Sequence, residues 1–278
     1  MSQTAASPLL PTIAFIGGGN MASAIIGGLI HQGHPASQIE VVEPWAEARE
    51  ALRKNYGIEA QAEAGPALQR AQIVVWAVKP QTFRDAAAQA KAHTQGALHL
   101  SVAAGIRSDS IAQWLGTERI VRTMPNTPAL VGKGMSALYA RPAVSAPERQ
   151  SIEAIMATTG EFLWVDSEPQ LDAVTALSGS GPAYVFYFLE AMTRAGTGMG
   201  LTEQQAHQLA VGTFVGASEL ARRSDDPPSV LRQRVTSKGG TTYAALQSME
   251  AAGVAASFEA AMRAAQHRAH ELGDEFGA

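Results

Sequence analysis

The pattern of hydrophobic positions in the first half of the chain predicts an α/β domain. Short runs of β-branched residues alternate with alanine-rich stretches of helical spacing, as expected when helices cover both faces of a parallel sheet. The run IVVWAV at 73–78 is apolar throughout, which predicts a central strand buried on both faces. We therefore expect a doubly wound parallel sheet with strands at 12–17, 39–43, 73–78, 98–103, 119–124, 134–139 and 162–165.

The second half has a different pattern, which predicts an all-helical C-terminal domain. From about Pro169 the β-branched runs end and apolar residues recur at helical spacing. Thr202 and Gln205 have the spacing of a capping box, so one helix should begin there and end near Ser224. The prolines of DDPP at 225–228 end that helix and start the next one.

Composition and charge favour a globular protein that acts on a small molecule. Hydrophobic residues make up 46% of the 278 residues and charged residues 17%, which is enough apolar surface for a sizeable core. The 21 Lys and Arg against 25 Asp and Glu give a net charge of −4, so we expect no binding to nucleic acid. The chain has no cysteine, which excludes a disulfide framework, a thiolate nucleophile and a zinc site built on sulfur.

The sequence also predicts a cytoplasmic protein without a membrane span. Glycines and a proline interrupt the longest uncharged stretch, 173–189, so it is a poor candidate for a transmembrane helix. Residues 1–11 lack the basic and apolar regions of a signal peptide and are expected to form a flexible N-terminal tail.

A glycine-rich motif between an apolar strand and an amphipathic helix predicts a dinucleotide site. Its form is G-x-G-x-x-A. In a Rossmann-like fold Gly17 permits the tight turn, Gly19 lets the backbone approach a pyrophosphate, and Ala22 allows close helix–strand packing. The helix N-terminus adds N–H donors and a positive dipole end. The alternative is a purely structural turn. The candidate residues are Gly17, Gly18, Gly19, Asn20, Met21 and Ala22.

Residues after the second and third strands are further cofactor candidates. Glu43 ends the second strand where an acidic residue bonds the adenosine ribose, which favours NADH. Arg49 and Arg53 follow it, either as acceptors of the 2′-phosphate of NADPH or as surface charges, so the choice between NADPH and NADH stays open. The third strand runs into Ala77, Val78, Lys79 and Pro80, and Lys79 is either a ligand contact or a surface lysine.

Three further clusters mark loops and helix starts. RTMPNTP at 122–128 predicts a rigid loop at the crevice, because two prolines fix its conformation. LSGSGPAY at 177–184 lacks the spacing of a nucleophile elbow and more commonly indicates close helix packing. VTSKGGTT at 235–242 joins two helices, and its glycines and hydroxyls suit a small carboxylate, although an ordinary turn is equally compatible.

Acidic and histidine side chains are weaker candidates. Asp166, Glu168 and Asp172 crowd the segment between the two halves, either as general acids or as solvated carboxylates, and Glu168 is the one to follow. His267 and His270 lie three residues apart on the last helix without further ligands nearby in sequence, so we expect no metal site.

Taken together, the motifs resemble those of the pyrroline-5-carboxylate reductase family over nearly the whole chain. FIGGGNMASAI, AVKP, VRTMPNTP and LSGSGPAYVF occur in the family's order, and PPSVLRQRVTSKGGTTYAALQSME at 227–250 resembles its signature segment. The resemblance implies NADPH or NADH as cofactor, held by the residues at 17–22 and 77–80 and by Ala103, Ala104 and Gly105. It implies a substrate pocket lined by Glu168, Ser237, Gly239, Gly240 and Thr242.

The change of pattern near 165–169 divides the chain into a flexible tail at 1–11, a dinucleotide-binding domain at 12–167 and a helical domain at 168–278. The resemblance implies that the helical part is a substrate and dimerisation domain and that the chain forms a homodimer or higher homo-oligomer. Two positions depart from the family pattern. Lys238 stands where many relatives have proline, which leaves the stiffness of the loop open, and Ala64 stands where many have an asparagine that touches the adenosine end.

The implied reaction is hydride transfer to the C=N carbon of 1-pyrroline-5-carboxylate, which gives L-proline in the last step of proline biosynthesis. A protonated cyclic imine is already electrophilic, so the protein mainly has to position it. Ser237 with the amides of Gly239 and Gly240 would hold the carboxylate, and the catalytic Thr242 would hydrogen-bond the imine nitrogen.

Two alternatives remain at this stage. A 3-hydroxy-acid dehydrogenase of similar architecture would need a catalytic lysine in the helical half, where Lys238 is the only lysine after Lys133. A cofactor-binding regulator without turnover is the other alternative.

Overall fold

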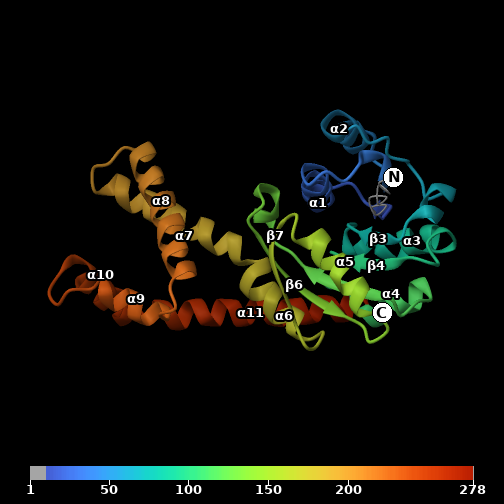
Figure 1. Cartoon of the computed structure of the whole chain (residues 1–278). Coiled ribbons are helices and arrows are strands. Elements are labelled where there is room, and N and C mark those ends of the chain that lie inside the picture. The colour runs from blue at the N-terminus through green and yellow to red at the C-terminus, as the bar shows by residue number, and fades with distance from the viewer. Residues whose placement is uncertain (1–10, 278) are drawn as a thin grey trace, which may run out of the picture. The chain divides into compact units, whose positions relative to one another are not determined.

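The protein is described here by a computed structural model that covers residues 11–277 (Figure 1). The predicted tail at 1–11 therefore lies, apart from Pro11, outside the described residues. Two compact units make up the chain, one comprising the chain up to Ser180 together with the stretch from Ala265, the other comprising Gly181–Ala264. The division falls after Ser180, later than the sequence-based boundary at 167–168, because the helix at Gln170–Val174 contacts the strands at Ile120–Met124 and Gly134–Ala140 of the first unit.

The first unit is built on one mixed sheet with the strand order β2-β1-β3-β4-β5-β6-β7. β3 lies between β1 and β4 and is buried over its whole length, as IVVWAV predicted. All seven predicted strands are found, and the predicted α/β class with a Rossmann-like sheet is confirmed. The strands are β1 (Ile13–Ile16), β2 (Ile39–Val42), β3 (Ile73–Trp76), β4 (Leu98–Ser101), β5 (Ile120–Met124), β6 (Gly134–Ala140) and β7 (Gly160–Trp164).

The direction of β6 corrects the expectation of a parallel sheet. β1 to β5 are parallel, but β6 runs antiparallel to β5, with Val121 opposite Ala140, and β7 runs parallel to β6. The cause is the short connection between β5 and β6, which holds only a 3₁₀ turn at Thr127–Val131. A parallel neighbour needs a crossover of a dozen or more residues, whereas an antiparallel one needs only a turn.

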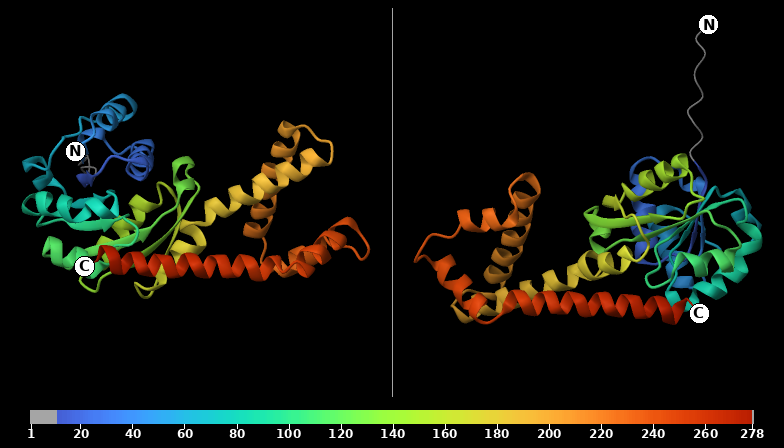
Figure 2. Two further views of the ribbon diagram at one scale, coloured as in Figure 1. Left: turned by 180° about the vertical axis from the view of Figure 1, so that it is seen from behind. Right: turned by 90° about the horizontal axis from the view of Figure 1, so that it is seen from below.

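Alternation along the strands divides the sheet into two buried faces. Ile13 and Phe15 belong to a hydrophobic cluster with residues of α1 (Asn20–His31), α2 (Ala46–Tyr56) and α5 (Ala146–Met156). Ala14 and Ile16 belong to a second cluster with residues of α3 (Pro80–Ala90) and α4 (Ser108–Leu115) and with Phe276. Successive side chains of a strand point to opposite faces, so helices cover both sides of the sheet, as a doubly wound fold requires (Figure 2).

Six α-helices and a π-helical turn accompany the sheet in residues 11–180. The helix α5 begins with the capping box of Ser145 and Glu148. The π-helical turn at Thr175–Gly179 has no counterpart in the sequence-based expectations. The helices are α1 (Asn20–His31), α2 (Ala46–Tyr56), α3 (Pro80–Ala90), α4 (Ser108–Leu115), α5 (Ala146–Met156) and α6 (Gln170–Val174).

The second unit is helical, which confirms the predicted change of pattern. The helix predicted from Thr202 has Thr202 as its N-cap, Gln205 in the capping box and Ser224 as its C-cap. Gly196 of α7 lies so close to α8 that a Cβ there would be 2.8 Å from the Cβ of Ala206. The helices are α7 (Gly181–Gly198), α8 (Glu203–Arg223), α9 (Pro228–Arg234), α10 (Thr241–Ala251) and α11 (Val254–Phe276), the last of which ends in the first unit.

Among residues 11–277, none of the helices is both long and apolar enough to cross a membrane.

Candidate functional site

The carboxyl ends of β1 to β4 meet at one edge of the sheet and form the candidate cofactor site. β2 lies on one side of β1 and β3 on the other, so the chain changes direction across the sheet between β1 and β3. In open α/β sheets such a switch point is where ligands bind, outside the carboxyl ends of the strands. The predicted cofactor residues at 17–22, 77–80 and 103–105 follow β1, β3 and β4 and are therefore brought to this edge.

Gly17 begins the turn from β1 into α1 in a conformation that glycine alone adopts readily. Its φ of +96° lies in the left-handed region. A Cβ built at Gly17 would be 2.5 Å from the carbonyl oxygen of Ala77, the residue after β3. The Gly17 amide donates to the Val42 carbonyl at 2.8 Å. Gly17, directly after β1, thus contacts the ends of both neighbouring strands, β2 through its hydrogen bond to Val42 and β3 through its close approach to Ala77.

Gly19 offers open space where a phosphate would approach. It is the N-cap of α1, and a Cβ there would meet no described atom within 4 Å. Its φ of −71° and ψ of −168° are ordinary for any residue, so the turn itself does not require glycine here. The first turn of α1 carries no acidic residue and receives no side-chain cap from the described residues. These N–H groups fit a pyrophosphate, which helix N-termini bind readily.

Glu43 is buried beneath the glycine turn. The side chain is only 5% exposed. Its Oε2 accepts the Gly18 amide at 2.7 Å, and its Oε1 accepts the Trp45 amide at 2.9 Å. A ribose contact of Glu43 stays a prediction, while the contact to Gly18 shows that this carboxylate also shapes the turn.

The two arginines after β2 differ in their surroundings. Arg49 donates from Nη1 to the carbonyls of Glu43 and Pro44, at 2.9 and 2.7 Å. Its guanidinium therefore lies at the carboxyl end of β2. Arg53 instead pairs with Glu50 on the exposed side of α2. Of the two candidates, Arg49 lies where a Rossmann-like fold holds the adenosine ribose.

The ends of β3 and β4 supply the remaining predicted cofactor contacts. Lys79 is exposed and serves as N-cap of α3, whose first residue is Pro80. After β4, the Ala103 amide donates to Ser101 Oγ at 3.3 Å. Gly105 has a φ of +71°, and a Cβ there would be 3.1 Å from the Cβ of Leu272 in α11. The last turns of α11 thus pack against the Ala103–Gly105 loop, a contact that the sequence did not predict.

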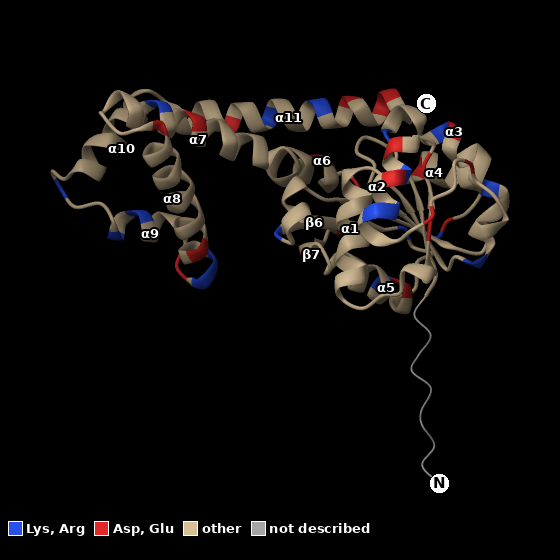
Figure 3. Ribbon diagram, turned by 90° about the horizontal axis from the view of Figure 1, so that it is seen from above, with Lys and Arg blue, Asp and Glu red and all other residues tan. Residues whose placement is uncertain are grey.

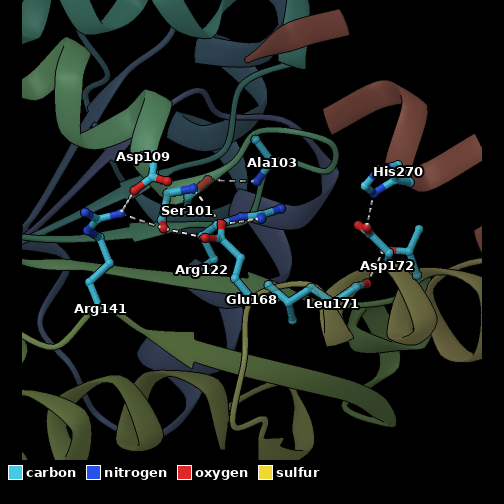
Figure 4. A network of polar contacts seen from close by, with 11 residues as sticks. Ser101, Ala103, Asp109, Arg122, Arg141, Glu168, Leu171, Asp172 and His270 are labelled. Carbon is cyan, nitrogen blue, oxygen red and sulfur yellow. Dashed lines mark hydrogen bonds and ion pairs between the residues drawn. The ribbon is translucent and has the colours of Figure 1, made fainter. Parts of the chain in front are cut away.

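Glu168 lies in a network of polar contacts on the first unit (Figure 4). Its Oε1 accepts the Ser108 amide and Arg122 Nη1, both at 2.6 Å, and its Oε2 accepts the Ser108 hydroxyl at 2.6 Å. Arg141 donates to the Ser108 hydroxyl at 3.0 Å and also pairs with Asp109. Figure 4 shows Glu168 and Arg122 pointing toward one another. Sequence reasoning missed Ser108 and treated Arg122 only as part of a loop.

The predicted carboxylate loop lies in the helical unit, between α9 and α10. The Gly240 amide donates to the Ser237 carbonyl at 3.0 Å, which closes a four-residue turn. Gly239 has a φ of +77°, and a Cβ at Gly240 would be 2.6 Å from Ser237 Oγ. The structure therefore brings Ser237, Gly239 and Gly240 together, and the positive φ of Gly239 favours glycine at that position.

Thr242 follows this turn in the first turn of α10, whose N-cap is Gly240. Thr242 is partly buried, whereas Ser237, Lys238, Gly239 and Thr241 are exposed. The same helix pair has a pocket lined by Arg232, Gln233, Thr236, Tyr243, Leu246, Gln247 and Glu250, a set that does not include the predicted substrate residues.

Asn126 joins two of the sequence motifs. Its side-chain nitrogen donates to the Ser178 carbonyl at 3.1 Å, and its side-chain oxygen accepts the Met135 amide at 2.9 Å. A Cβ at Gly179 would be 2.5 Å from Met124 Cε. Gly179 of LSGSGPAY thus permits close packing, here against the last residue of β5, whereas the sequence analysis had expected packing between helices.

Metal ligands do not gather in the described part of the chain. Within it, no group of three or more His, Asp or Glu side chains is placed to hold a metal ion. His270 instead contacts Asp172, with Nδ1 3.3 Å from Oδ2, and His267 contacts Glu271 on α11.

Known proteins match both units. Residues 168–272 match the family described as pyrroline-5-carboxylate reductase dimerisation, and residues 12–105 match the family described as NADP oxidoreductase coenzyme F420-dependent. Pyrroline-5-carboxylate reductase of Pseudomonas aeruginosa is 45% identical over 269 residues, which cover 96% of this chain and 98% of that protein.

Solved structures show the same fold. A pyrroline-5-carboxylate reductase from Coxiella burnetii matches with a TM-score of 0.87 and 37% identity over 94% of this chain and 98% of that one. The pyrroline carboxylate reductase of Plasmodium falciparum, solved with NADP bound, matches with a TM-score of 0.85 and 27% identity over 95% of this chain and 98% of that one. These likenesses favour imine reduction over oxidation of a 3-hydroxy acid. The chain belongs to the pyrroline-5-carboxylate reductase family.

Proposed function

We propose that this chain catalyses its family's reaction, the reduction of 1-pyrroline-5-carboxylate to L-proline with NADPH or NADH. In this proposal the edge of the sheet binds the cofactor, and the turn between α9 and α10 binds the substrate. The observation that supports the reaction most strongly is the 45% identity to a pyrroline-5-carboxylate reductase over 96% of this chain. When bound, the cofactor supplies the hydride for the C=N carbon. The protein has to bind and orient the two reactants.

The edge of the sheet is proposed to bind the cofactor. The amides at the start of α1 hold the pyrophosphate, Gly17 keeps the turn close to β3, and Gly19 leaves room for the phosphate oxygens. The Ala77–Pro80 and Ala103–Gly105 loops border the same edge. This assignment is supported by the fit of the open space at Gly19 and of the uncapped helix start to an anionic group.

The turn between α9 and α10 is proposed to bind the substrate carboxylate. Ser237 supplies a hydroxyl and Gly239 an amide at the start of a helix, where the dipole favours a negative charge. The Gly240 amide already bonds the Ser237 carbonyl, so Gly240 contributes by closing the turn around this site. The Thr242 hydroxyl donates a hydrogen bond to the neutral imine nitrogen or accepts one from the N–H of the protonated imine, so that the ring is held for attack on the C=N carbon. No strong acid is needed, because the protonated imine is already electrophilic.

Replacing Thr242 tests the role of its hydroxyl. We expect Thr242→Ala to lower kcat/KM for 1-pyrroline-5-carboxylate by about tenfold or more, the worth of one hydrogen bond to a charged group. Thr241→Ala is the matched control, because Thr241 is the preceding threonine of the same helix and is exposed. Wild-type kinetics in Thr242→Ala would remove Thr242 from the mechanism, whereas loss in both variants would indicate a general effect on α10.

We also propose that the chain forms a homodimer or higher homo-oligomer through its helical unit. Charged residues of α8 lie near its two ends, and the middle of the helix is free of them (Figure 3). Apolar side chains such as Leu209, Val215 and Leu220 are 59–69% exposed in the single chain. Burial of that surface in a partner would remove the cost of exposing it.

Light scattering on the purified protein tests the assembly. We expect the measured mass to be that of a dimer or of a multiple of a dimer. The double substitution Leu209→Glu with Leu220→Glu should lower the measured mass. The mass of a single 29.1 kDa chain for the wild type would contradict the proposal.

We also propose a cytoplasmic location, which cell fractionation tests. Recovery of the protein with the membrane fraction would contradict this location.

A further inference from the structure

Helix α4 begins without a capping side chain of its own. The residue at its N-cap position is Arg107, which has no acceptor to offer the first amides, and no local side-chain cap forms within the described residues. The amides of a first helical turn have no partner inside the helix, so a buried helix start needs acceptors from elsewhere. Ser108, the first residue of α4, is 1% exposed and therefore depends on such an acceptor.

Glu168 supplies that acceptor from a position sixty residues further along the chain. One carboxylate oxygen takes the Ser108 amide and the other takes the Ser108 hydroxyl, each at 2.6 Å. Arg122 Nη1, also at 2.6 Å, balances the negative charge. The Glu168 and Arg122 side chains are only 18% and 9% exposed. Short bonds to a charged acceptor are stronger than neutral ones, and this pair is also shielded from water.

The helix start that Glu168 holds is continuous with the Ala103–Gly105 loop. Ser101 Oγ fixes the beginning of the loop through the Ala103 amide, and Leu272 packs against Gly105 in its middle. Arg107, directly before the helix, pairs with Asp274 at 2.7 Å. Glu168 holds the segment at its other end, where α4 begins. Its ion pair with Arg122 is more buried than the pair of Arg107 with Asp274.

We propose that Glu168 is a positioning residue for the cofactor, which caps α4 and so keeps the Ala103–Gly105 loop in the shape that receives the nicotinamide dinucleotide. The proposal rests on the assignment of this loop to the cofactor under the proposed function. This role differs from the one that the family resemblance implies for Glu168, which is a direct contact with the substrate. Both carboxylate oxygens are engaged by Ser108 and Arg122, so a substrate contact would have to compete with charge-assisted bonds.

Glu168→Gln is the direct test, because glutamine keeps the size of the side chain but replaces one acceptor oxygen by an NH₂ group and removes the charge. We expect the Kd of NADPH, measured by fluorescence titration of the full-length protein without substrate, to rise about tenfold, as for the loss of one charge-assisted hydrogen bond. We expect the KM for 1-pyrroline-5-carboxylate at saturating cofactor to stay within about twofold of the wild type.

Glu118→Gln is the matched control. Glu118 accepts from Arg141 Nε at 2.7 Å in the same network, but it is 60% exposed and does not bond the start of α4. Its substitution should leave the Kd of NADPH unchanged. Glu168→Asp keeps the charge and should restore part of the cofactor affinity lost in Glu168→Gln. If Glu168→Gln does not fold, Ser108→Ala removes one of the three bonds and should raise the Kd by about threefold.

The outcomes separate positioning from substrate binding. A raised substrate KM with an unchanged Kd of NADPH in Glu168→Gln would overturn the proposal and return Glu168 to the substrate pocket. Unchanged values of both constants would overturn it as well. The proposed function is tested separately by the wild-type protein, because it fails only if wild-type protein does not oxidise cofactor when 1-pyrroline-5-carboxylate is added.

Discussion

Gly17 and Ala77 touch where β1 and β3 end, so closely that a Cβ at Gly17 would lie 2.5 Å from the Ala77 carbonyl oxygen. The contact joins the glycine turn to the strand on the other side of the switch point. Gly17 also has a φ of +96°, which disfavours any other residue. The turn is therefore fixed by backbone contacts before any cofactor binds.

This contact predicts different effects for two neighbouring glycines. Gly17→Ala should lower the free energy of unfolding by about 2 kcal/mol or more, from backbone strain and the clash with Ala77. Gly19→Ala should lower it by about 1 kcal/mol or less, because only the N-cap preference changes, yet raise the Kd of NADPH by filling the space for the pyrophosphate. Urea unfolding and cofactor titration of both variants check this. Equal loss of stability in the two would contradict it.

Arg49 is predicted to affect the choice between the two cofactors. Its guanidinium lies at the carboxyl end of β2, held by the carbonyls of Glu43 and Pro44, and a 2′-phosphate there would gain a charge-assisted contact. Arg49→Gln should raise the KM for NADPH about tenfold and leave the KM for NADH nearly unchanged. Arg53→Gln is the control, since Arg53 pairs with Glu50. An equal change of KM for both cofactors would show that Arg49 does not read the 2′-phosphate.

Lys238 is predicted to be replaceable by proline with a gain in stability. The turn Ser237–Gly240 is closed by a hydrogen bond, and its third residue, Gly239, has a positive φ of +77°. This is the pattern of a type II turn, in which proline is favoured at the second position. Lys238→Pro should raise the free energy of unfolding by about 0.5 kcal/mol, because proline lowers the conformational entropy of the unfolded chain. The variant should keep kcat/KM within about twofold of the wild type. A loss of stability would show that the Lys238 backbone does not suit proline.

His99 makes the stability of the fold dependent on pH. Burial, first of all, lowers its pKa from 6.5 to about 4, and a nearby Arg119 acts in the same direction, while a hydrogen bond to the Thr94 backbone opposes them. Trp76 Nε1 donates to His99 Nδ1 at 3.0 Å, which requires this nitrogen to be unprotonated. The folded state therefore binds fewer protons than the unfolded chain between pH 6.5 and about 4.

The stability that neutral His99 contributes is present above pH 6.5 and is lost as the pH falls toward 4, by about 3 kcal/mol in total. His99→Gln keeps an acceptor for Trp76 but does not titrate. We expect the difference in free energy of unfolding between wild type and His99→Gln to shift by this amount across the window, measured by urea unfolding at several pH values. A constant difference would contradict a depressed pKa.

The sequence predicted those features that depend on local signals. The capping box of Thr202 and Gln205 located α8 to the residue, and the apolar run at 73–78 identified the central strand. The glycine turn and the turn at 237–240 were also recognised, because tight turns restrict the residue types that form them. The antiparallel direction of β6 was missed, although the short connection at 125–133 carries a signal for it.

Contacts between distant segments could not be predicted in this way. Nothing around Ser108 indicates that Glu168 caps its helix, because the two residues are sixty positions apart and the sequence singled out Glu168 only as a candidate acid and substrate contact. The return of α11 to the first unit, where Leu272 meets Gly105, is equally invisible to periodicity. Such contacts depend on the tertiary fold rather than on local sequence signals.

Every role proposed above depends on one activity, the reduction of 1-pyrroline-5-carboxylate by this protein with a nicotinamide cofactor. The most direct measurement is the absorbance of NADPH or NADH at increasing concentrations of this imine, with L-proline quantified in the same samples. We predict that one molecule of cofactor is oxidised for each molecule of proline formed. In Thr242→Ala, kcat/KM for the imine should be lower by about tenfold or more. Folded protein that binds the cofactor but oxidises neither NADPH nor NADH in the presence of the imine would contradict this activity.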